Sequence, residues 1–568
     1  MSELIQYPGW PAGLPRSLDY PEVPVHCLLK SSAATYGDQE ALVYREAGWS
    51  FAKLWELAGR LAAGLKKLGI AKGDVVGVCM TNVPQYLVAY YGTLLAGATY
   101  TPLSPMLSAK ELEHQANTAG AKAVVVYQPF VDNILPLRQV SAVHTVIATS
   151  DAQCADMMAP DQPRDGCLDF GRLLAENAPD FSEPALEPRK DLAHIAFTGG
   201  TTGLSKGVAV SHFNVTVNTL QTAHWRAGGR PSLQNGLLKF IERDPDQKNS
   251  PMIYSTQPGA DTMVNVAPWF HALGIVVAVN SSMYMGHRLV THTRLNLEEY
   301  IADIARYRAS MIAGVPTLFY ELAHLPSLKD YNLSGVRLLR FGAAPLDPEL
   351  WRRLGQLFPG AAVSAAYGLT ESTTIATSNP TTNTGVIKVG SAGLPIFDTD
   401  VKIIDPESGQ DLPTGQNGEV CLRGPQVTLG YLNQPEETAQ VYLADGWLRT
   451  GDLGHLDPDG YLFLVGRRKE MLIYKGYNVF PVELESVLYQ HPAVKLCAVV
   501  GLPDPTAGEI PKAFVCLREG ARASEKELMD FVNEKVSPYK KIRQLEFLEQ
   551  MPLTPAGKIL KRKLVETA

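Results

Sequence analysis

Short apolar runs alternate with amphipathic stretches through most of the first 400 residues. Residues 75–79 form a β-branched run that predicts a strand, and a helix is expected between Pro84, which suits a first turn, and Gly97. Residues 98–103 again have strand character. Ser108, followed by Glu111 three residues later, predicts the N-cap of another helix. This alternation predicts layered α/β subdomains with largely parallel sheets.

The pattern changes after Gly390, where short strands are separated by Gly, Pro and Asp. A small β-rich subdomain is therefore expected at about 390–466, within a large N-terminal domain that spans 1–466. A charged run at 467–470 then opens a small, mobile α+β C-terminal domain, 467–568, of a size usual for one domain. Its expected elements are strand 471–474, helix 481–490, strands 496–500 and 513–517, helix 525–536 and a strand near Leu545.

The segment from Arg226 to Thr262 does not join this pattern, because it is rich in polar residues, Gly and Pro. We expect a long surface excursion, which could cover a pocket or support a subunit contact.

The composition excludes some classes of function but does not identify one. The 568 residues are 45% hydrophobic, so the chain can bury a large core, and the net charge of -7 shows no basic stripe suited to nucleic acid. The seven scattered cysteines include no CxxC pair, and neither a signal peptide nor an apolar run long enough to span a membrane is apparent. A cytoplasmic protein with no nucleic-acid partner is expected; peripheral membrane contact and a homodimer stay open.

The sequence FTGGTTGLSKGVAVSH, residues 197–212, places glycines, hydroxyl groups and one lysine between two apolar runs. Its GLSKG segment matches a serine nucleophile elbow in letters only, because a strand rather than a helix is expected to follow. A Walker A loop is excluded because Lys206 is followed by glycine. A phosphate-binding loop and an ordinary solvated hairpin remain, and the loop alone does not decide between them.

Six further segments decide in favour of the phosphate loop. With residues 197–212, they resemble in order the motifs of the adenylate-forming superfamily, which includes acyl- and aryl-CoA synthetases, luciferases and the adenylation domains of peptide synthetases. The segments are 268–274, 341–346, 366–372, 447–454, 466–485 and 553–562.

The resemblance implies an AMP-forming acid–thiol ligase that uses ATP, Mg²⁺ and coenzyme A. An otherwise inert carboxylate attacks the α-phosphate of ATP, and a thiol then displaces AMP from the acyl-adenylate. Both steps move phosphate charge, so catalysis depends on positioning and electrostatics.

The resemblance also assigns roles to residues. Lys558 would neutralise charge during adenylation, Glu371 would hold Mg²⁺, and Thr370 would contact the AMP phosphate. Tyr367 would stack on adenine, and Asp452 and Arg467 would bind the ribose. His271 is placed with the catalytic residues because it lines the acyl site in relatives, without an acid–base role. The other expected nucleotide- and CoA-binding residues are Thr198, Gly199, Gly200, Thr201, Thr202, Gly203, Ser205, Lys206, Gly342, Ala343, Ala344, Pro345, Gly368, Lys475 and Gly476.

Lys469 falls at the family's hinge, about which the C-terminal domain rotates after adenylation so that Gly476 leaves room for the pantetheine arm. Lys475 is a candidate helper in that second step. One departure from the family pattern is Gly199, which stands where many relatives have serine.

The acid itself is expected to be apolar. Trp269, Phe270, Val315, Phe319 and Leu339 fall in segments that line the acyl pocket in relatives. The sequence of the phosphate loop favours a medium- or long-chain fatty acid, with an aryl acid as the alternative. No clear cation for a second carboxylate is visible, though His224 and Arg340 are nearby and could serve. A luciferase-like oxygenase and an enzyme that loads a carrier protein are less favoured, because no carrier-like segment follows Lys558.

Overall fold

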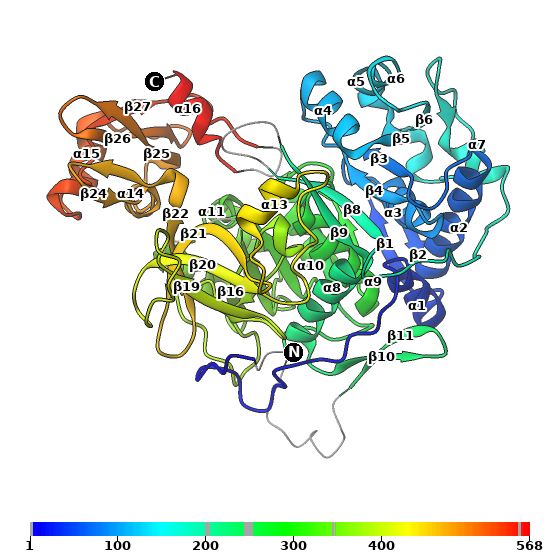
Figure 1. Cartoon of the computed structure of the whole chain (residues 1–568), viewed down its shortest axis with the longest axis horizontal. Helices are drawn as coiled ribbons and strands as arrows, with labels where there is room; N and C mark the ends of the chain where they lie inside the picture. The colour runs from blue at the N-terminus through cyan, green and yellow to red at the C-terminus, as the bar shows by residue number, and fades with distance from the viewer. Residues whose placement is uncertain are drawn as a thin grey trace.

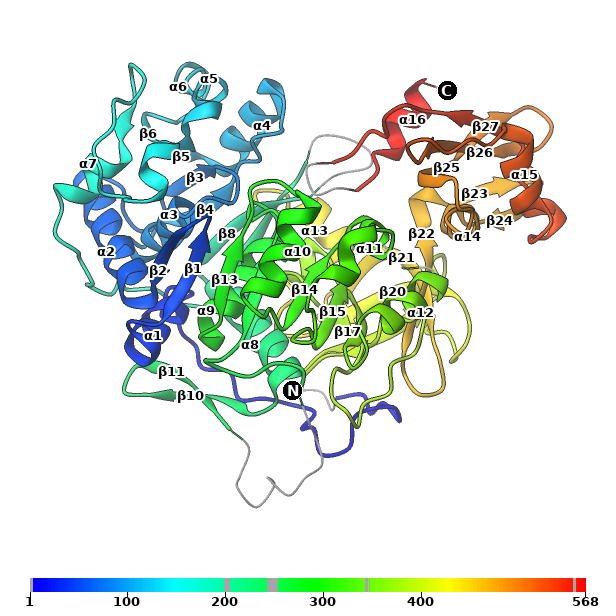
Figure 2. The ribbon, with the colours of Figure 1, turned by 180° about the vertical axis from the view of Figure 1, so that it is seen from behind.

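The computed structural model describes residues 4–198, 205–242, 254–342, 346, 348–554 and 558–567. Figure 1 shows two large α/β units side by side, with a small unit coloured orange to red at one end of the molecule. Figure 2 shows the same arrangement from behind, with the helices α10, α11 and α12 in front of the second large sheet.

The first unit is built on a seven-stranded sheet of order β7-β6-β5-β3-β4-β8-β9. Every pairing in it is parallel except the antiparallel pair β8–β9, which flanks the phosphate loop. The strands are β3 (Val75–Cys79), β4 (Thr99–Pro102), β5 (Ala121–Tyr127), β6 (Thr145–Thr149), β7 (Leu168–Asp169), β8 (Leu192–Phe197) and β9 (Gly207–Ser211).

The second unit contains a nine-stranded sheet of order β18-β17-β16-β15-β14-β12-β13-β1-β2. Its centre, from β16 to β1, is parallel throughout. The strands are β1 (Glu40–Tyr44), β2 (Ala47–Ser50), β12 (Thr262–Asn265), β13 (Arg288–Thr291), β14 (Met311–Gly314), β15 (Leu338–Phe341), β16 (Ala362–Tyr367), β17 (Thr377–Ser378) and β18 (Leu394–Pro395).

Helices separate and cover the two sheets. The helix α8 (His212–Ala227) and the π-helix η4 (Leu273–Asn280) are almost wholly buried and belong to one core cluster with strands of both sheets. The opposite face of the nine-stranded sheet packs on α10 (Leu297–Arg306), α11 (Pro316–Ala323) and α12 (Pro348–Leu357). The remaining α-helices of these units are α1 (Cys27–Tyr36), α2 (Phe51–Lys67), α3 (Gln85–Leu95), α4 (Ala109–Ala119), α5 (Val131–Ile134), α6 (Leu137–Val140), α7 (Phe170–Ala175) and α9 (Ser281–Met285).

Several local predictions are confirmed. The strand β3 has the expected bounds, and α3 follows Pro84 as predicted. Ser108 caps α4 in a complete capping box: its hydroxyl accepts from the Glu111 backbone N–H, and the Glu111 carboxylate accepts from the Ser108 backbone N–H at 2.8 Å. The mixed α/β fold class is therefore the one that the hydrophobic pattern predicts.

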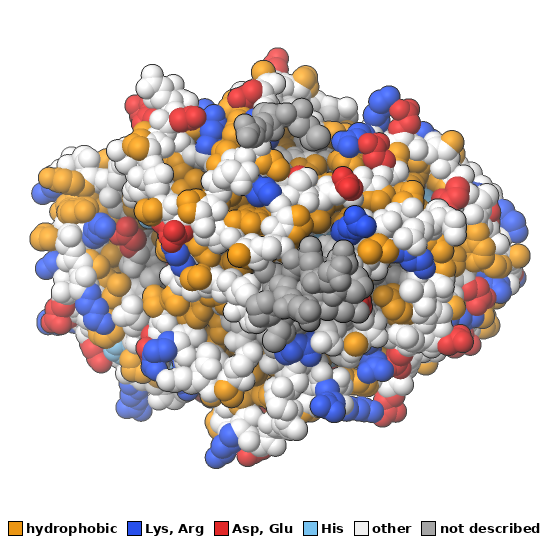
Figure 3. Space-filling view, turned by 90° about the horizontal axis from the view of Figure 1, so that it is seen from below, with side chains coloured by type: hydrophobic (Ala, Val, Ile, Leu, Met, Phe, Trp, Pro, Cys, Tyr) orange, Lys and Arg blue, Asp and Glu red, His pale blue; other side chains and the backbone are white. Residues whose placement is uncertain are grey.

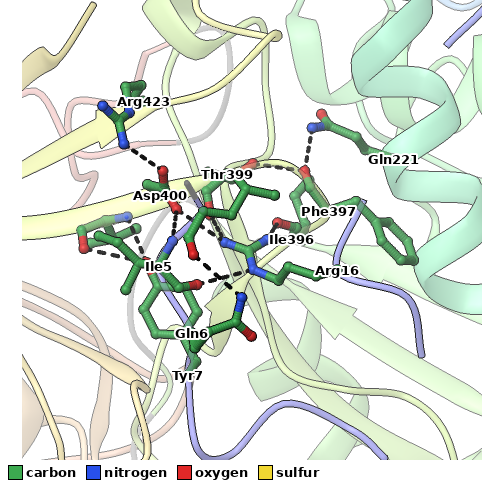
Figure 4. Close-up of polar contacts among 12 residues, drawn as sticks. Ile5, Gln6, Tyr7, Arg16, Gln221, Ile396, Phe397, Thr399, Asp400 and Arg423 are labelled. Atoms are coloured by element: carbon green, nitrogen blue, oxygen red, sulfur yellow. Dashed lines mark hydrogen bonds and ion pairs between the residues drawn. The ribbon is translucent and has the colours of Figure 1, made fainter. Parts of the chain in front are cut away.

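A four-stranded antiparallel sheet follows, made of β19 (Asp400–Ile404), β20 (Gly418–Arg423), β21 (Leu448–Leu456) and β22 (Leu462–Arg467), with α13 (Pro435–Val441) beside it. The N-terminal segment is tied to this sheet (Figure 4). The Ile5 backbone N–H donates to Asp400 at 3.0 Å, and the Val401 backbone N–H donates to the Tyr7 hydroxyl oxygen at 2.9 Å. Arg16 and Arg423 both form ion pairs with the buried carboxylate of Asp400.

The last unit has a five-stranded sheet in the order β24-β23-β26-β25, with β27 paired to β26. Its elements are β23 (Leu472–Tyr474), β24 (Tyr477–Val479), α14 (Pro481–Leu488), β25 (Val494–Asp504), β26 (Gly508–Leu517), α15 (Glu525–Asn533), β27 (Gln544–Phe547) and α16 (Lys561–Thr567). The predicted order of strands and helices is confirmed, and the sequence pattern missed β24 and the length of β25 and β26.

The expectation that Arg226–Thr262 is wholly a surface excursion is wrong at both ends. Arg226 and Thr262 are buried, and residues 230–241 form a hairpin, β10 (Arg230–Gln234) and β11 (Leu237–Ile241), of which Leu238 is buried and hydrogen-bonded to Ser31 of α1. Polar composition predicted exposure because it does not reveal hydrogen-bond partners distant in sequence. Residues 243–253 lie outside the described part.

On the face shown in Figure 3, acidic and basic side chains are interspersed rather than gathered by sign. Among the described residues, none of the helices combines the length and apolar character required to cross a bilayer.

Candidate active site

A buried carboxylate, Asp452, lies at the centre of the candidate site. The antiparallel register of β21 and β22 places Asp452 opposite Arg467, and the two form an ion pair of 3.1 Å between Nε and Oδ1. The Tyr367 hydroxyl, at the end of β16, donates to Oδ2 at 2.7 Å. Burial raises the pKa of Asp452, and the positive charge of Arg467 opposes that rise. Three segments separated in sequence therefore converge on one carboxylate.

Lys558, which belongs to the C-terminal part of the chain, lies near this carboxylate. Burial lowers the pKa of its ammonium group, the positive charge of Arg467 lowers it further, and the negative charge of Asp452 opposes both. The turn that carries Lys558 is held by its backbone N–H, which donates to the Thr554 hydroxyl at 3.0 Å. The structure thus brings the C-terminal lysine to the same centre as Tyr367 and Arg467.

Glu371 and Lys206 are connected through a residue that the sequence reasoning missed. The Tyr431 hydroxyl donates to Glu371 Oε1 at 2.8 Å, and the Lys206 ammonium lies 4.9 Å from the centroid of the Tyr431 ring. Lys206 also forms an ion pair with Glu437. Tyr431 lies in the sequence GYLN, whose backbone pairs with β9, and this turn-like sequence was the only signal available.

Glu371 fits a magnesium ion. Burial raises the pKa of its carboxyl group, so a neighbouring cation would favour the charged form. Mg²⁺ in nucleotide sites is commonly held by one or two carboxylates together with substrate phosphates, and Glu371 supplies one such carboxylate. The ion would neutralise phosphate charge there.

A cavity of about 30 Å³, room for one water molecule, lies between the seven-stranded sheet, the start of η4 and the turn at residues 370–373. Phe270 and His271, which the resemblance places on the acid side, line it together with Thr370, which the resemblance places at the AMP phosphate. The remaining lining residues are Tyr100, Pro102, His194, Ala196, Phe197, Val210, Ala272, Ile275 and Thr373. Most of these side chains are apolar or aromatic, the lining expected of an organic-acid site, although in this conformation the cavity has room only for a water molecule.

His271 is held as a neutral ring. Burial lowers its pKa to about 4, and the charge of Lys558 acts in the same direction. Nδ1 accepts a hydrogen bond from the Leu273 backbone N–H at 3.3 Å, so the proton of the neutral ring resides on Nε2. The ring can therefore donate a hydrogen bond without carrying charge.

The wall of the cavity is made by a strained turn. Thr373 has φ +62° and ψ −57°, and the Thr374 backbone N–H bonds the Ser372 carbonyl at 2.6 Å, which defines a γ-turn of the rarer hand. Such backbone geometry costs about 1–3 kcal/mol in a residue other than glycine. Gly368 permits the turn, because a Cβ there would lie 1.6 Å from the Thr374 carbonyl oxygen.

The phosphate loop is described only at its two ends. The Thr198 backbone N–H donates to the Lys206 carbonyl at 3.1 Å, and the Ser205 hydroxyl accepts from Gln115 at 3.1 Å. Gly342 directly follows β15 and lies beside Ala366. The other predicted nucleotide-binding residues lie outside the described part: Gly199, Gly200, Thr201, Thr202, Gly203, Ala343, Ala344 and Pro345.

The predicted acid-pocket residues are not all brought to the cavity. Phe270 lines it, whereas Trp269 is fully buried beside it and donates its indole N–H to Asn265 at 2.9 Å. Phe319 and Leu339 lie in the core cluster on the other face of the nine-stranded sheet. Alternation along β15 explains this, because Leu338 and Leu339 point to opposite faces. Val315, which caps α11, does not line the cavity either.

The predicted hinge and thiol-side residues lie at the surface of the C-terminal part. Lys469 is exposed in the short 3₁₀ turn η7 (Arg468–Glu470). Lys475 and Gly476 form the two-residue turn between β23 and β24, with φ +50° and +82°. Lys561, which the sequence analysis did not select, forms ion pairs with Glu470 at 2.9 Å and Glu485 at 2.8 Å.

Comparison with known proteins agrees with these motifs. Residues 29–432 match the AMP-binding enzyme family, and residues 483–558 match the AMP-binding enzyme C-terminal domain. The chain is 31% identical to a long-chain-fatty-acid–CoA ligase of Bacillus subtilis, over 98% of this chain and 97% of that protein. It is 34% identical to a probable 4-coumarate–CoA ligase of Dictyostelium discoideum, over 96% and 95%.

Solved structures show the same architecture. The anthranilate CoA ligase AuaEII, in complex with anthranoyl-AMP, superposes with a TM-score of 0.83 at 25% identity and 98% coverage of both chains. ATP-bound MatB from Rhodopseudomonas palustris gives 0.81 at 28% identity, with 96% and 99% coverage. The chain therefore belongs to the AMP-binding, adenylate-forming enzymes and is an AMP-forming acyl- or aryl-CoA ligase, an acid–thiol ligase that uses ATP, Mg²⁺ and coenzyme A.

Proposed function

We propose that the chain joins an apolar carboxylic acid to coenzyme A, with a medium- or long-chain fatty acid as the expected substrate and an aryl acid as the alternative. The observation that carries the proposal is the meeting of Tyr367, Asp452, Arg467 and Lys558 beside a cavity with an apolar and aromatic lining. Both acid classes are retained because the chain is about equally similar to two kinds of ligase. These are the long-chain-fatty-acid–CoA ligase of Bacillus subtilis and the probable 4-coumarate–CoA ligase of Dictyostelium discoideum.

In the first step, a carboxylate oxygen of the acid bonds to the α-phosphorus of ATP, and the bond to pyrophosphate breaks. Lys558 would neutralise the negative charge that develops between the two reactants. Asp452 would accept the ribose hydroxyls, with Arg467 beside it, and Tyr367 would pack on adenine. Glu371 would hold Mg²⁺, while Lys206, Thr198, Ser205 and Thr370 would bind phosphate oxygens.

In the second step, the sulfur of coenzyme A bonds to the acyl carbon and AMP leaves. We propose that the boundary at 466/467 separates two domains and that the smaller one rotates about Lys469 between the steps. The exposed, unpacked turn at Lys475 and Gly476 would then face the pantetheine arm, and a Cβ at Gly476 meets no atom within 4 Å in the present arrangement.

The decisive experiment is a pyrophosphate-release panel across saturated acids of increasing length and aryl acids of increasing size, each with and without coenzyme A. Formation of a thioester with one of these acid classes supports the proposal. Pyrophosphate release without a thioester, even when coenzyme A is in excess, would contradict it. Carrier protein and oxygen are then supplied separately, because transfer to a carrier or light emission would indicate the two disfavoured functions.

A further inference from the structure

Two arginines are buried in the interior of the second α/β unit. Arg226, near the end of α8, is 1% exposed, and Arg340, on β15, is 3% exposed. Arginine is rarely buried so completely unless an anion or several acceptors compensate its charge. Neither residue belongs to the nucleotide-binding cluster around Asp452.

The two guanidinium groups differ in how well they are satisfied. Arg226 donates to the Thr222 carbonyl at 3.1 Å and to the Ser281 hydroxyl, and a third nitrogen lies 3.1 Å from Met311 Sδ. All three nitrogens of Arg340 lack a hydrogen-bond partner among the residues that the structure describes. Burial and the positive charge of Arg226 lower the pKa of Arg340 to about 9, so it still carries its charge at neutral pH.

Nearby groups do not supply the missing anion. Asp261 is the carboxylate whose charge acts on Arg226, but it already forms an ion pair with Arg337 and accepts from the Gln257 backbone N–H at 2.8 Å. His224, the other cation considered for a second carboxylate, uses both ring nitrogens, on the Gly228 carbonyl and the Tyr284 hydroxyl. Among Arg226, His224 and Arg340, only Arg340 has no hydrogen-bond acceptor among the residues that the structure describes.

The strand register places Arg340 on the face of the nine-stranded sheet that α8 and η4 cover, although Arg340 does not line the cavity itself. Along β15, Arg340 points to the same face as Leu338, which packs in the cluster containing α8, η4 and Phe270. Its register neighbours on β14 and β16 are Ala313 and Ser364. Both are small, so the space over the sheet beside the guanidinium is not filled by side chains of adjacent strands.

The helix η4 runs from the cavity to the surroundings of Arg226. Its N-terminal end follows His271 at the cavity, and its C-terminal end leads into Ser281, which contacts Arg226. Eight residues span roughly 12 Å at the α-helical rise of 1.5 Å, and less in a π-helix, whose turns are wider. Arg340 itself lies two residues before Gly342, where the nucleotide-binding motif begins. An acid that ran beside η4 from Lys558 would reach the arginines with its far end.

We propose that Arg340, supported by Arg226, binds a second carboxylate at the far end of the substrate, so that the enzyme prefers dicarboxylic acids. This rests on the proposed function, since the same site would activate the acid; it keeps the apolar body and places a second carboxylate at the end where a monocarboxylic acid has none. The reacting carboxylate forms the mixed anhydride with AMP, and the second carboxylate stays unreacted in two parallel N–H···O bonds. It compensates a charge that is otherwise buried and unpaired.

The test compares matched acids: adipate, suberate and sebacate against hexanoate, octanoate and decanoate, and terephthalate against 4-methylbenzoate. The wild-type kcat/KM is expected to favour the better dicarboxylate over its monocarboxylic match by roughly 10- to 100-fold, the range for hydrogen bonds to a charged group. Arg340→Met is expected to remove that preference, and Arg340→Lys to retain part of it. The aliphatic and aryl pairs show which skeleton the site accepts.

Arg337→Met is the matched control, because Arg337 lies three residues away and already pairs with Asp261. It should leave the dicarboxylate preference intact and lower the melting temperature, whereas Arg340→Met should raise the melting temperature of the ligand-free protein. A wild-type preference for monocarboxylic acids, or an equal loss on both acids in Arg340→Met, would overturn the inference.

A thermal-shift titration with suberate alone separates the two proposals, since it needs no turnover. Stabilisation of the wild type but not of Arg340→Met supports the second-carboxylate site even if no thioester forms. Absence of stabilisation, together with octanoate-dependent thioester formation, rejects the site and leaves the proposed function standing.

Discussion

Replacement of Lys558 separates the two half-reactions. We expect Lys558→Met to reduce acyl-adenylate formation by roughly 10²–10³-fold, the loss typical when one preorganised group that stabilises transition-state charge is removed. An ammonium about 4 Å from a phosphate oxygen contributes on the order of 4 kcal/mol at an effective dielectric constant near 20, which agrees with that loss. Thiolysis of a supplied acyl-adenylate should stay near the wild-type rate, because the role proposed for the lysine is confined to the first step.

The charge state of Lys558 also predicts how adenylation depends on pH. Its pKa lies below the ordinary 10.5 because of burial and the nearby Arg467, so adenylation should fall as pH rises through that lowered pKa. Lys558→Arg, which keeps its charge, should move this alkaline limit upward.

Adenylation is measured by exchange of labelled pyrophosphate into ATP, and thiolysis by release of AMP from synthetic acyl-adenylate. Lys526→Met is the control, since Lys526 is an exposed lysine of the same domain that pairs with Asp530 on α15. Equal losses in the two half-reactions of Lys558→Met would refute the assigned role, as would an unchanged alkaline limit in Lys558→Arg.

Two further predictions concern acid stability and the thiol step. Burial lowers the pKa of His194 to about 3 and those of His224, His271 and His287 to about 4. Because the unfolded chain takes up these protons first, the stability present above about pH 6.5 should fall as pH decreases toward 4. The expected loss at pH 5 is on the order of 2 kcal/mol per histidine. Urea midpoints measured from pH 7 to 5 check this, and a constant midpoint would contradict it. Gly476→Trp should leave pyrophosphate exchange intact while blocking thioester formation, and normal thioester yield would argue against a pantetheine path at that turn.

The sequence by itself determined the elements whose cause is local. Ser108 and Glu111 are three residues apart, and their capping box forms as the spacing predicts. The alternation of β-branched runs and amphipathic helices likewise predicted the layered sheets, because it reflects which faces must be buried. The family motifs identified Tyr367, Asp452, Arg467 and Lys558 as candidates before their proximity was known.

Only the tertiary structure decided how distant residues combine. Tyr431 and Glu371 are 60 positions apart, and no local pattern predicts their hydrogen bond. Leu339 seemed a pocket residue until the register of β15 placed it on the far face of the sheet, and the polar segment that starts at Arg226 proved to begin in the core. Local patterns record the preferences of neighbours along the chain, whereas burial and pairing depend on contacts that form only when separate elements pack together.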